Sequence, residues 1–383
     1  MLSNSIGMMG ETVALGWLTL ELTNSPFLVG AAMGARSLPL FFVGVPAGVI
    51  ADRFPRHRLL IATTTGQALT AATIGLLTLL GLVRLPEILI LTFTAGMIRG
   101  VEQAARQSYT HDVVGAARLM DGFAVLGVAM RSGWLVGSLV TGVVIARFGA
   151  GAAYVAVSLA YLIAALAILP AGAPPTSAPP AGGSAWKSVT GFLTAIRRDR
   201  VLPVLMLLTA GAEVLGFSHQ AVLPTLARDV LHVGPEGLGV MSAARSVGGI
   251  LALFAMSSVG LAGGGTLFLM VLVSFGAALV GLAVAPHLVG FAGVVVLLVA
   301  VNAAGALSDL LAQSLLQLSV PANLRGRAGG AWVVAIGLAP LGQLQIGAMA
   351  SLFGASIALG ASGLALVALA VIGALAVPRI RNI

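Results

Sequence analysis

The feature that most constrains this chain is the length of its uncharged runs. No Asp, Glu, Lys or Arg occurs from Ser246 to Ser308 or from Ala328 to Pro378. A helix needs about 20 apolar residues to cross a membrane, so these runs have room for about five crossings. Over the whole chain 58% of residues are hydrophobic and 8% are charged, against about 25% charged in a soluble domain. The chain is therefore predicted to lie mostly in lipid, which excludes a soluble enzyme or a disordered protein.

The same runs favour helices over a membrane β-barrel, because barrel strands alternate apolar and polar residues and these runs do not. The absence of cysteine excludes disulfides and thiol chemistry. The first apolar segment begins at Leu2 with no basic residue before it, so we expect no cleavable signal peptide. The net charge of +8 does not indicate nucleic-acid binding, because the basic residues lie in separate loops rather than on one face.

The hydropathy pattern predicts an all-α integral membrane protein with twelve transmembrane helices in two halves of six. The N-terminal half is 1–170, a cytoplasmic linker covers 171–200, and the C-terminal half is 201–383. The linker begins with proline, glycine and serine and ends in a segment, 186–200, that is predicted to be an interfacial amphipathic helix. The expected spans are 2–22, 27–50, 59–82, 88–107, 119–146, 150–170, 201–224, 236–260, 264–284, 288–316, 328–353 and 356–377.

Orientation follows from the distribution of Lys and Arg between the two sets of loops. Most of the 20 basic residues fall in one set and at the C-terminus, whereas the opposite loops carry Arg84, Arg147 and Arg228. Because positive charge is retained in the cytoplasm, we expect the linker and both termini to be cytoplasmic.

The two halves also show sequence matches that are typical of an internal repeat. The matching residues are Met33–Ser37 with Ser242–Ser246, Glu11 with Glu213, and Glu102 with Asp309. Two six-helix halves in parallel repeat are a transporter architecture, in which the substrate site lies at the repeat interface.

One loop carries a more specific pattern. In the segment 48–58, Gly48 is followed four residues later by Asp52 and Arg53, and then by a basic cluster that includes Arg56. This segment resembles the loop signature of the major facilitator superfamily, although Pro55 stands where that family has a second glycine. The resemblance implies the major facilitator fold.

Further segments are similar to the enterobactin-exporter-like and macrolide-efflux-like branch of that superfamily. They are Ala14–Leu18, Glu21–Pro26, Ala35–Pro39, Ala105–Gln107, Leu324–Arg327 and Gly337–Gly342. The resemblance covers nearly the whole chain and implies proton-coupled export across a bacterial inner membrane. It does not identify the substrate.

The fifth span resembles an antiporter signature through the small residues Gly133, Gly137 and Gly142, with Ser138 in place of a usual proline. The same spacing is an ordinary device for close helix packing. Both interpretations remain open from the sequence.

Eight charged residues are expected at bilayer depth, and each costs roughly 2.5–3.5 kcal/mol there unless it is paired or hydrated. These eight, which lie away from the span ends, are Glu11, Arg36, Arg99, Glu102, Arg131, Glu213, Arg245 and Asp309. We predict that Glu11 and Glu213 carry protons or bind a cation in the central cavity. The alternative for each is a static ion pair with an arginine. Arg36 is predicted to pair with Glu11 or to hold an anionic group of the substrate.

A gating network is predicted on the cytoplasmic side. Arg99, Glu102 and Arg106 share one helix face through their i, i+3 and i+7 spacing. We expect this face to join the loop that contains Gly48, Asp52, Arg53 and Arg56. In the other half, Asp309 is expected to form a matching latch with Arg325. His219 is interpreted as a packed residue rather than a proton relay.

Together these features predict a secondary active transporter that exports a small amphipathic molecule, such as a drug or siderophore, in exchange for protons. We expect a monomer with no cofactor, no metal and no nucleic-acid partner. An enzyme is not expected, because no nucleophile–base set, phosphate loop or metal-spaced cluster is found. Two alternatives remain: an importer or facilitator of a polar nutrient or metal ion, and a non-transporting membrane protein for assembly or sensing.

Overall fold

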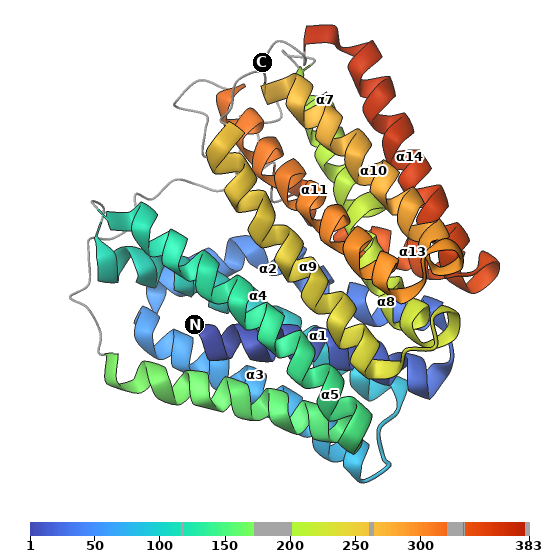
Figure 1. Ribbon diagram of the computed structural model, residues 1–383. Helices are drawn as coiled ribbons and strands as arrows, with labels where there is room; N and C mark the ends of the chain where they lie inside the picture. The colour runs from blue at the N-terminus through green and yellow to red at the C-terminus, as the bar shows by residue number, and fades with distance from the viewer. Residues whose placement is uncertain (116–117, 172–200, 260–263, 320–331, 333, 380–383) are drawn as a thin grey trace. The chain divides into compact units, whose positions relative to one another are not determined.

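The computed structural model describes residues 1–115, 118–171, 201–259, 264–319, 332 and 334–379 (Figure 1). The predicted linker beyond residue 171 lies outside these residues, as does Arg325. The surroundings of Gly48 and the side chain of Asp52, both within one helix, also lie outside the description. Every regular element in the described residues is a helix.

Five helices make up the first part of the chain. They are α1 (Leu2–Thr23), α2 (Pro26–Arg53), α3 (Arg56–Leu79), α4 (Leu85–Val114) and α5 (Leu119–Ile168), with a short 3-10 turn η2 (Leu169–Ala171) after them. The turn from α1 to α2 follows directly from its residues. Asn24 ends α1 in the left-handed conformation with φ 50°, the Ser25 side chain accepts a hydrogen bond from the Leu28 amide, and Pro26 occupies the first helical turn.

The helix α5 contains both the fifth and the sixth expected spans. Its apolar stretch Ala124–Ala171 is 48 residues long, which corresponds to about 72 Å of helix and so to about twice the hydrocarbon thickness. Gly149 breaks the helical geometry with φ 82° and ψ 170°. A positive φ of this size suits glycine alone, and the break falls between the expected spans 119–146 and 150–170.

The second part of the chain is less regular at its start. In place of one helix over 201–224, the structure has α7 (Val201–Gly211), the π-helical turn η3 (Ala212–Gly216), the 3-10 turn η4 (Phe217–Val222), α8 (Leu223–Thr225) and the π-helical turn η5 (Leu226–Val230). Long regular helices follow. They are α9 (Gly234–Val259), α10 (Gly264–Leu288), α11 (Gly290–Leu318), α13 (Ala339–Phe353) and α14 (Ala355–Ala376).

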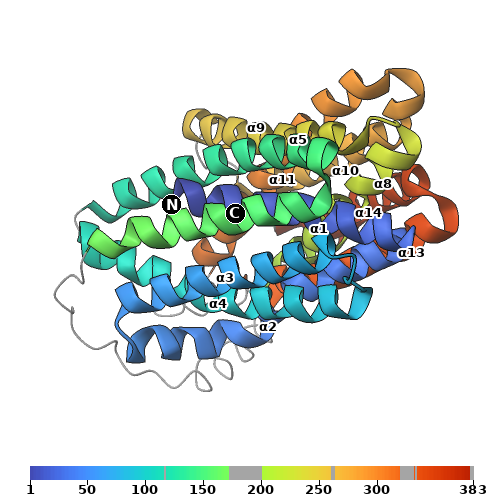
Figure 2. The ribbon, with the colours of Figure 1, turned by 90° about the horizontal axis from the view of Figure 1, so that it is seen from below.

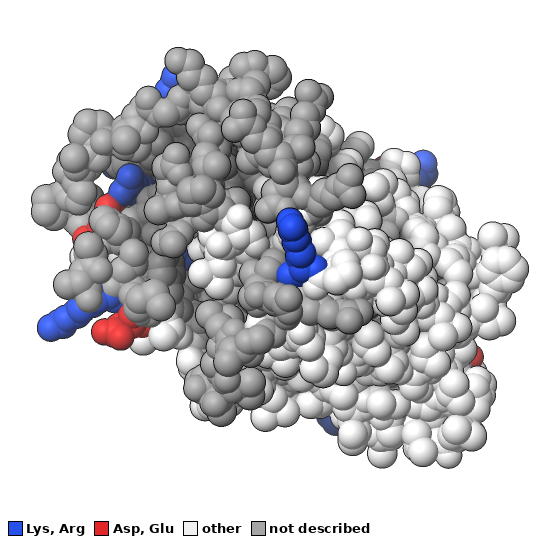
Figure 3. Space-filling model, turned by 90° about the horizontal axis from the view of Figure 1, so that it is seen from above, with Lys and Arg blue, Asp and Glu red and all other residues white. Residues whose placement is uncertain are grey.

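Nine helical stretches in the described residues are long and apolar enough to cross a membrane. Their outward side chains suit lipid, since Ile90, Leu166 and Phe254 are 65%, 62% and 68% exposed. Blue and red atoms are sparse among the white ones on the face shown in Figure 3. These features make the chain a multi-pass membrane protein. The number of spans, twelve, stays a prediction.

The chain divides into two compact units. The first comprises Met1–Ala181 with His232–Ala243, and the second comprises Gly182–Leu231 with Ala244–Ile383. In the first unit α1 packs along α5, while α3 lies beside both α4 and α5 (Figure 2). In the second unit α10 packs between α11 and α14. The predicted boundaries at 170 and 200 stay predictions.

Candidate functional site

In the first unit, Glu11 lies at the centre of a buried ionic cluster. Arg99 Nη2 donates to Glu11 Oε2 at 2.7 Å, and the Tyr161 hydroxyl donates to the same oxygen at 2.8 Å. Arg36 Nε lies 3.6 Å from Glu11 Oε1, and Arg36 Nη2 donates to the Met8 carbonyl at 3.1 Å. Glu11 is only 5% exposed. The carboxylate therefore has two cations and a hydroxyl as partners, supplied by α2, α4 and α5.

A second buried carboxylate in this unit, Glu102, joins three helices. Asn4 Nδ2 on α1 donates to Oε1 at 3.2 Å, and Gln67 Nε2 on α3 donates to Oε2 at 2.6 Å. Arg106, one turn further along α4, forms an ion pair with Oε1. Glu102 and Arg99 thus share a helix but contact separate sets of partners.

The remaining residues of the predicted gate are only partly described. Arg53 is exposed at the end of α2. Arg56, at the start of α3, forms an ion pair with Asp112 near the end of α4, with Nη1 2.6 Å from both carboxylate oxygens. The contacts of the Asp52 side chain lie outside the described residues, so its place in a gate stays a prediction.

In the second unit, Glu213 differs sharply from its repeat counterpart Glu11. It lies in the π-helical turn η3, and among the described residues no hydrogen bond or ion pair reaches its carboxylate. Its neighbour is a second acid, Asp309 on α11, which lies close enough to interact electrostatically. Asp309 Oδ1 accepts a hydrogen bond from Trp332 Nε1 at 3.0 Å. Two acids are thus neighbours in an apolar unit.

Close packing surrounds this irregular turn. A Cβ on Gly342 of α13 would lie 2.6 Å from the Val214 Cα, so α13 approaches the backbone directly beside Glu213. After the turn, Phe217 packs edge to face on Phe275 with ring centroids 5.3 Å apart. π-Helical turns of this kind occur frequently at functional sites.

The same unit contains a chain of hydrogen bonds that ends at an arginine. His219 Nδ1 donates to the Gly216 carbonyl at 2.7 Å, which leaves Nε2 as the acceptor for Asn302 Nδ2 at 3.4 Å. Arg245 Nε in turn donates to Asn302 Oδ1 at 3.3 Å. Within the described chain, Arg245 forms no ion pair with a carboxylate. Its guanidinium therefore retains donors for an acidic ligand, whereas its counterpart Arg36 faces Glu11.

Several partners in these clusters were not predicted from the sequence, namely Asn4, Gln67, Asp112, Tyr161 and Asn302. Asn4, Gln67 and Asn302 had a detectable signal, because an amide side chain inside an apolar span requires a hydrogen-bonding partner. Tyr161 had none, since a tyrosine in a membrane helix is also common at the lipid interface. His219 lies fully buried, and its interpretation as a packed residue stays a prediction.

The three glycines of the fifth span lie at close helix crossings within the first unit. A Cβ on Gly133 would meet Leu2 O at 2.7 Å, and one on Gly137 would clash with the carbonyl group of Ile6. A Cβ on Gly142 would lie 2.9 Å from the Gly239 Cα. The glycines therefore let backbones approach closely, and any further role in antiport stays a prediction.

We expect Gly137→Ala to destabilise the protein by about 1–3 kcal/mol, because the added methyl group meets backbone atoms of α1 that cannot move independently. The measurement is thermal unfolding of the purified protein in detergent. Gly127→Ala is the matched control on the same helix, since a Cβ there has nothing within 4 Å. Equal melting temperatures for the two variants would contradict the packing role.

The chain is a helical membrane protein with ionic groups held inside both units, and comparisons with known proteins define its class as a major facilitator transporter. The chain belongs to the transmembrane secretion effector family, whose model matches residues 1–382.

Among curated proteins, the staphyloferrin A transporter of Staphylococcus aureus (strain NCTC 8325 / PS 47) is 24% identical over 360 residues, covering 92% of this chain and 87% of the relative. Solved structures with a similar fold include a peptide transporter (TM-score 0.80, 15% identity, 100% of this chain and 93% of that one). A nucleoside transporter is also similar (TM-score 0.77, 14% identity, covering 99% of this chain and 98% of that one). A bacterial homologue of the human lysosomal transporter Spinster also has a similar fold (TM-score 0.75, 14% identity, covering 100% of this chain and 94% of that one). The protein is therefore a membrane transporter of the major facilitator type and not an enzyme.

Proposed function

We propose that the protein is a proton-coupled exporter of a small amphipathic molecule, with a siderophore as the favoured substrate class, in a bacterial inner membrane. The family's description as a secretion effector supports export. The staphyloferrin A transporter among its relatives supports a siderophore. In this proposal the protein works as a monomer by alternating access, with both termini in the cytoplasm.

The observation that carries the proposal is the isolated carboxylate of Glu213. An ionised carboxylate at membrane depth costs roughly 2.5–3.5 kcal/mol, and the described chain supplies no cation or hydrogen-bond donor to it. The nearby Asp309 adds repulsion when both acids are ionised. A proton or a cationic group removes that cost, so Glu213 is suited to load and release a proton during transport. A proton gradient drives transport only if the two conformations bind this proton differently.

The other charged residues take supporting roles in the proposal. Glu11 already has Arg99, Tyr161 and Arg36 around it, so it holds the helices of the first unit together. Its exchange of a proton would first require these contacts to open. Arg245, rather than Arg36, contacts an acidic group of the substrate, because no carboxylate in the described part of the chain balances its positive charge.

The test uses inverted membrane vesicles that are acid inside, with staphyloferrin A, a catecholate siderophore and a macrolide as substrates. We expect protein-dependent accumulation of at least one siderophore, and its loss when a protonophore collapses the gradient. Arg245→Gln is expected to lower uptake of the acidic staphyloferrin A more than uptake of the macrolide. Accumulation only in right-side-out vesicles would instead establish an importer, and gradient-independent uptake would exclude proton coupling.

A further inference from the structure

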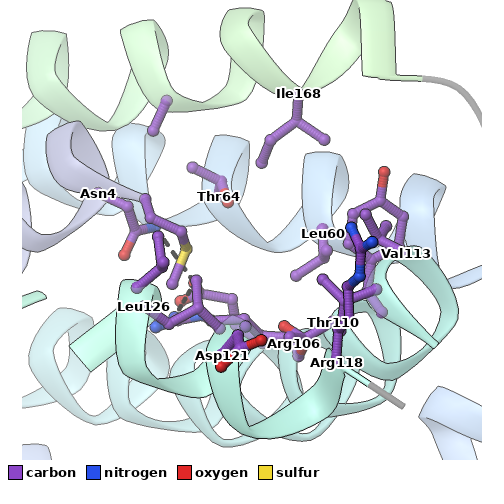
Figure 4. A pocket seen from close by; sticks show the side chains of 17 residues that line it. Asn4, Leu60, Thr64, Arg106, Thr110, Val113, Arg118, Asp121, Leu126 and Ile168 are labelled. Carbon is purple, nitrogen blue, oxygen red and sulfur yellow. Dashed lines mark hydrogen bonds and ion pairs between the residues drawn. The ribbon is translucent and has the colours of Figure 1, made fainter. Parts of the chain in front are cut away.

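The first unit contains a cavity of about 430 Å³ that lies outside the proposed proton and substrate site (Figure 4). It lies between α1, α3, α4 and both ends of α5. Pockets for small molecules usually have volumes of about 300–1,000 Å³. The cavity is formed entirely by residues of the first unit, whereas Glu213 and Arg245 belong to the second.

Three buried polar atoms of the cavity-lining residues have no hydrogen-bond partner in the described part of the chain. They are Asn4 Oδ1, Thr64 Oγ1 and Arg106 Nε, on α1, α3 and α4. Asn4 is 4% exposed and Thr64 1%. Buried polar atoms in native proteins nearly always have a partner. Three unpaired atoms on residues that line one cavity therefore indicate that an occupant satisfies them.

The hydrogen bonds to Glu102 define what that occupant must offer. Asn4 donates its amide nitrogen to Glu102, so its free Oδ1 is an acceptor. Arg106 pairs with the same carboxylate through Nη2, so its free Nε is a donor. Thr64 Oγ1 serves as either. Arg106 and Glu102 form an ion pair with each other. The three free atoms of Asn4, Thr64 and Arg106, which we call the floor of the cavity, therefore suit a neutral group that both donates and accepts.

The polarity of the cavity also gives the orientation of the ligand. Its walls are apolar side chains, including Leu60, Leu126 and Ile168, and its rim carries the exposed residues Val113, Arg118 and Asp121. Figure 4 shows the Asn4 and Thr64 side chains away from the rim residues Val113 and Arg118. A phospholipid would place its polar headgroup at the rim and its chains at the floor, which is the opposite arrangement.

We propose that this cavity binds a small neutral amphipathic molecule, such as an alcohol, a phenol or a primary amide. Its hydrogen-bonding group contacts Asn4, Thr64 and Arg106, and its apolar body lies along the walls towards the rim. Binding at this site requires no proton gradient and does not depend on Glu213.

The test measures binding of 4-butylphenol to the full-length protein in nanodiscs by titration calorimetry, with empty nanodiscs subtracted. We expect saturable binding of the phenol. 4-Butylanisole, which lacks the hydroxyl donor, is expected to bind about tenfold more weakly, as is the phenol to Thr64→Val, because each change removes a hydrogen bond. Thr63→Val is the matched control, since Thr63 already donates to the Leu59 carbonyl at 2.8 Å and does not line the cavity.

Ala164→Phe, which places a large side chain in the cavity, is expected to abolish binding. Absence of saturable binding to the wild-type protein would mean that the cavity holds water only, and would overturn the proposal. Equal affinities for the phenol and its methyl ether, or unchanged affinity in Thr64→Val, would overturn the assigned floor. Because Thr64→Val preserves side-chain shape, the test remains decisive if Ala164→Phe does not fold.

Discussion

Glu213→Gln is expected to abolish proton-driven accumulation of substrate, with a decrease of at least tenfold to the level seen after addition of a protonophore. Glutamine keeps the shape of the protonated carboxyl group but cannot release a proton. The variant is therefore fixed in the neutral state and has no coupling to the gradient. It should still exchange labelled for unlabelled substrate, because exchange needs binding and conformational change but no net proton movement. Uptake and exchange in inverted vesicles measure the two properties separately.

The matched control for this substitution is Glu236→Gln. Glu236 is an exposed acid in the first turn of α9, where loss of its charge changes helix stability by only about 0.3–1 kcal/mol. We expect vesicles with the Glu236→Gln variant to accumulate as much substrate as vesicles with the wild-type protein. If Glu213→Gln retains gradient-dependent accumulation and Glu11→Gln loses it, the proton site belongs to the first unit. The role that we propose for Glu213 would then be wrong.

Arg99→Met is expected to destabilise the protein by about 3–5 kcal/mol, because it leaves the buried Glu11 without its nearest cation. Arg36 would remain, but its Nε lies at 3.6 Å rather than the 2.7 Å of Arg99 Nη2. The measurement is denaturant-induced unfolding of the purified protein in mixed micelles. The double variant Glu11→Gln/Arg99→Met should recover a large part of the loss, since it removes both charges together.

An exposed ion pair provides the comparison for Arg99. Arg228 Nε lies 2.6 Å from Asp229 Oδ1, with side chains that are 28% and 41% exposed. Such pairs contribute about 0–1 kcal/mol, so Arg228→Met should change the unfolding free energy little. Equal losses for Arg99→Met and Arg228→Met would show that the Glu11 cluster contributes no more than a surface contact.

The local turns could be predicted well because their residues determine their geometry. Asn24, Ser25 and Pro26 end one helix and begin the next. The extent of α4, which runs to Val114 rather than to 107, could not be read from hydropathy. Its last turns contain polar residues, and Arg56 from another helix pairs with Asp112 there.

The pairing of the intramembrane charges could be predicted only in part. The sequence suggested Arg36 as a partner for Glu11, but Arg99, which is 88 residues away, makes the shorter contact. The repeat matches align Glu11 with Glu213 and Arg36 with Arg245, and we predicted the same role for the two acids. In the structure, Glu11 contacts two arginines and Glu213 contacts none among the described residues. Arg36 faces Glu11, whereas Arg245 donates to Asn302.

By itself, the sequence determined that this chain is a helical membrane protein, because uncharged runs of this length are stable only as helices in lipid. The resemblance of the loop at 48–58 added the major facilitator family. Only the tertiary structure decided which charges are neutralised inside it. Helices that are apolar on every side carry little information about the face each presents to its neighbours. Three features depend on residues far apart in the chain, so they became visible only when the helices were packed. They are the lack of a partner for Glu213 in the described chain, the full set of partners around Glu11, and the polar floor of the cavity.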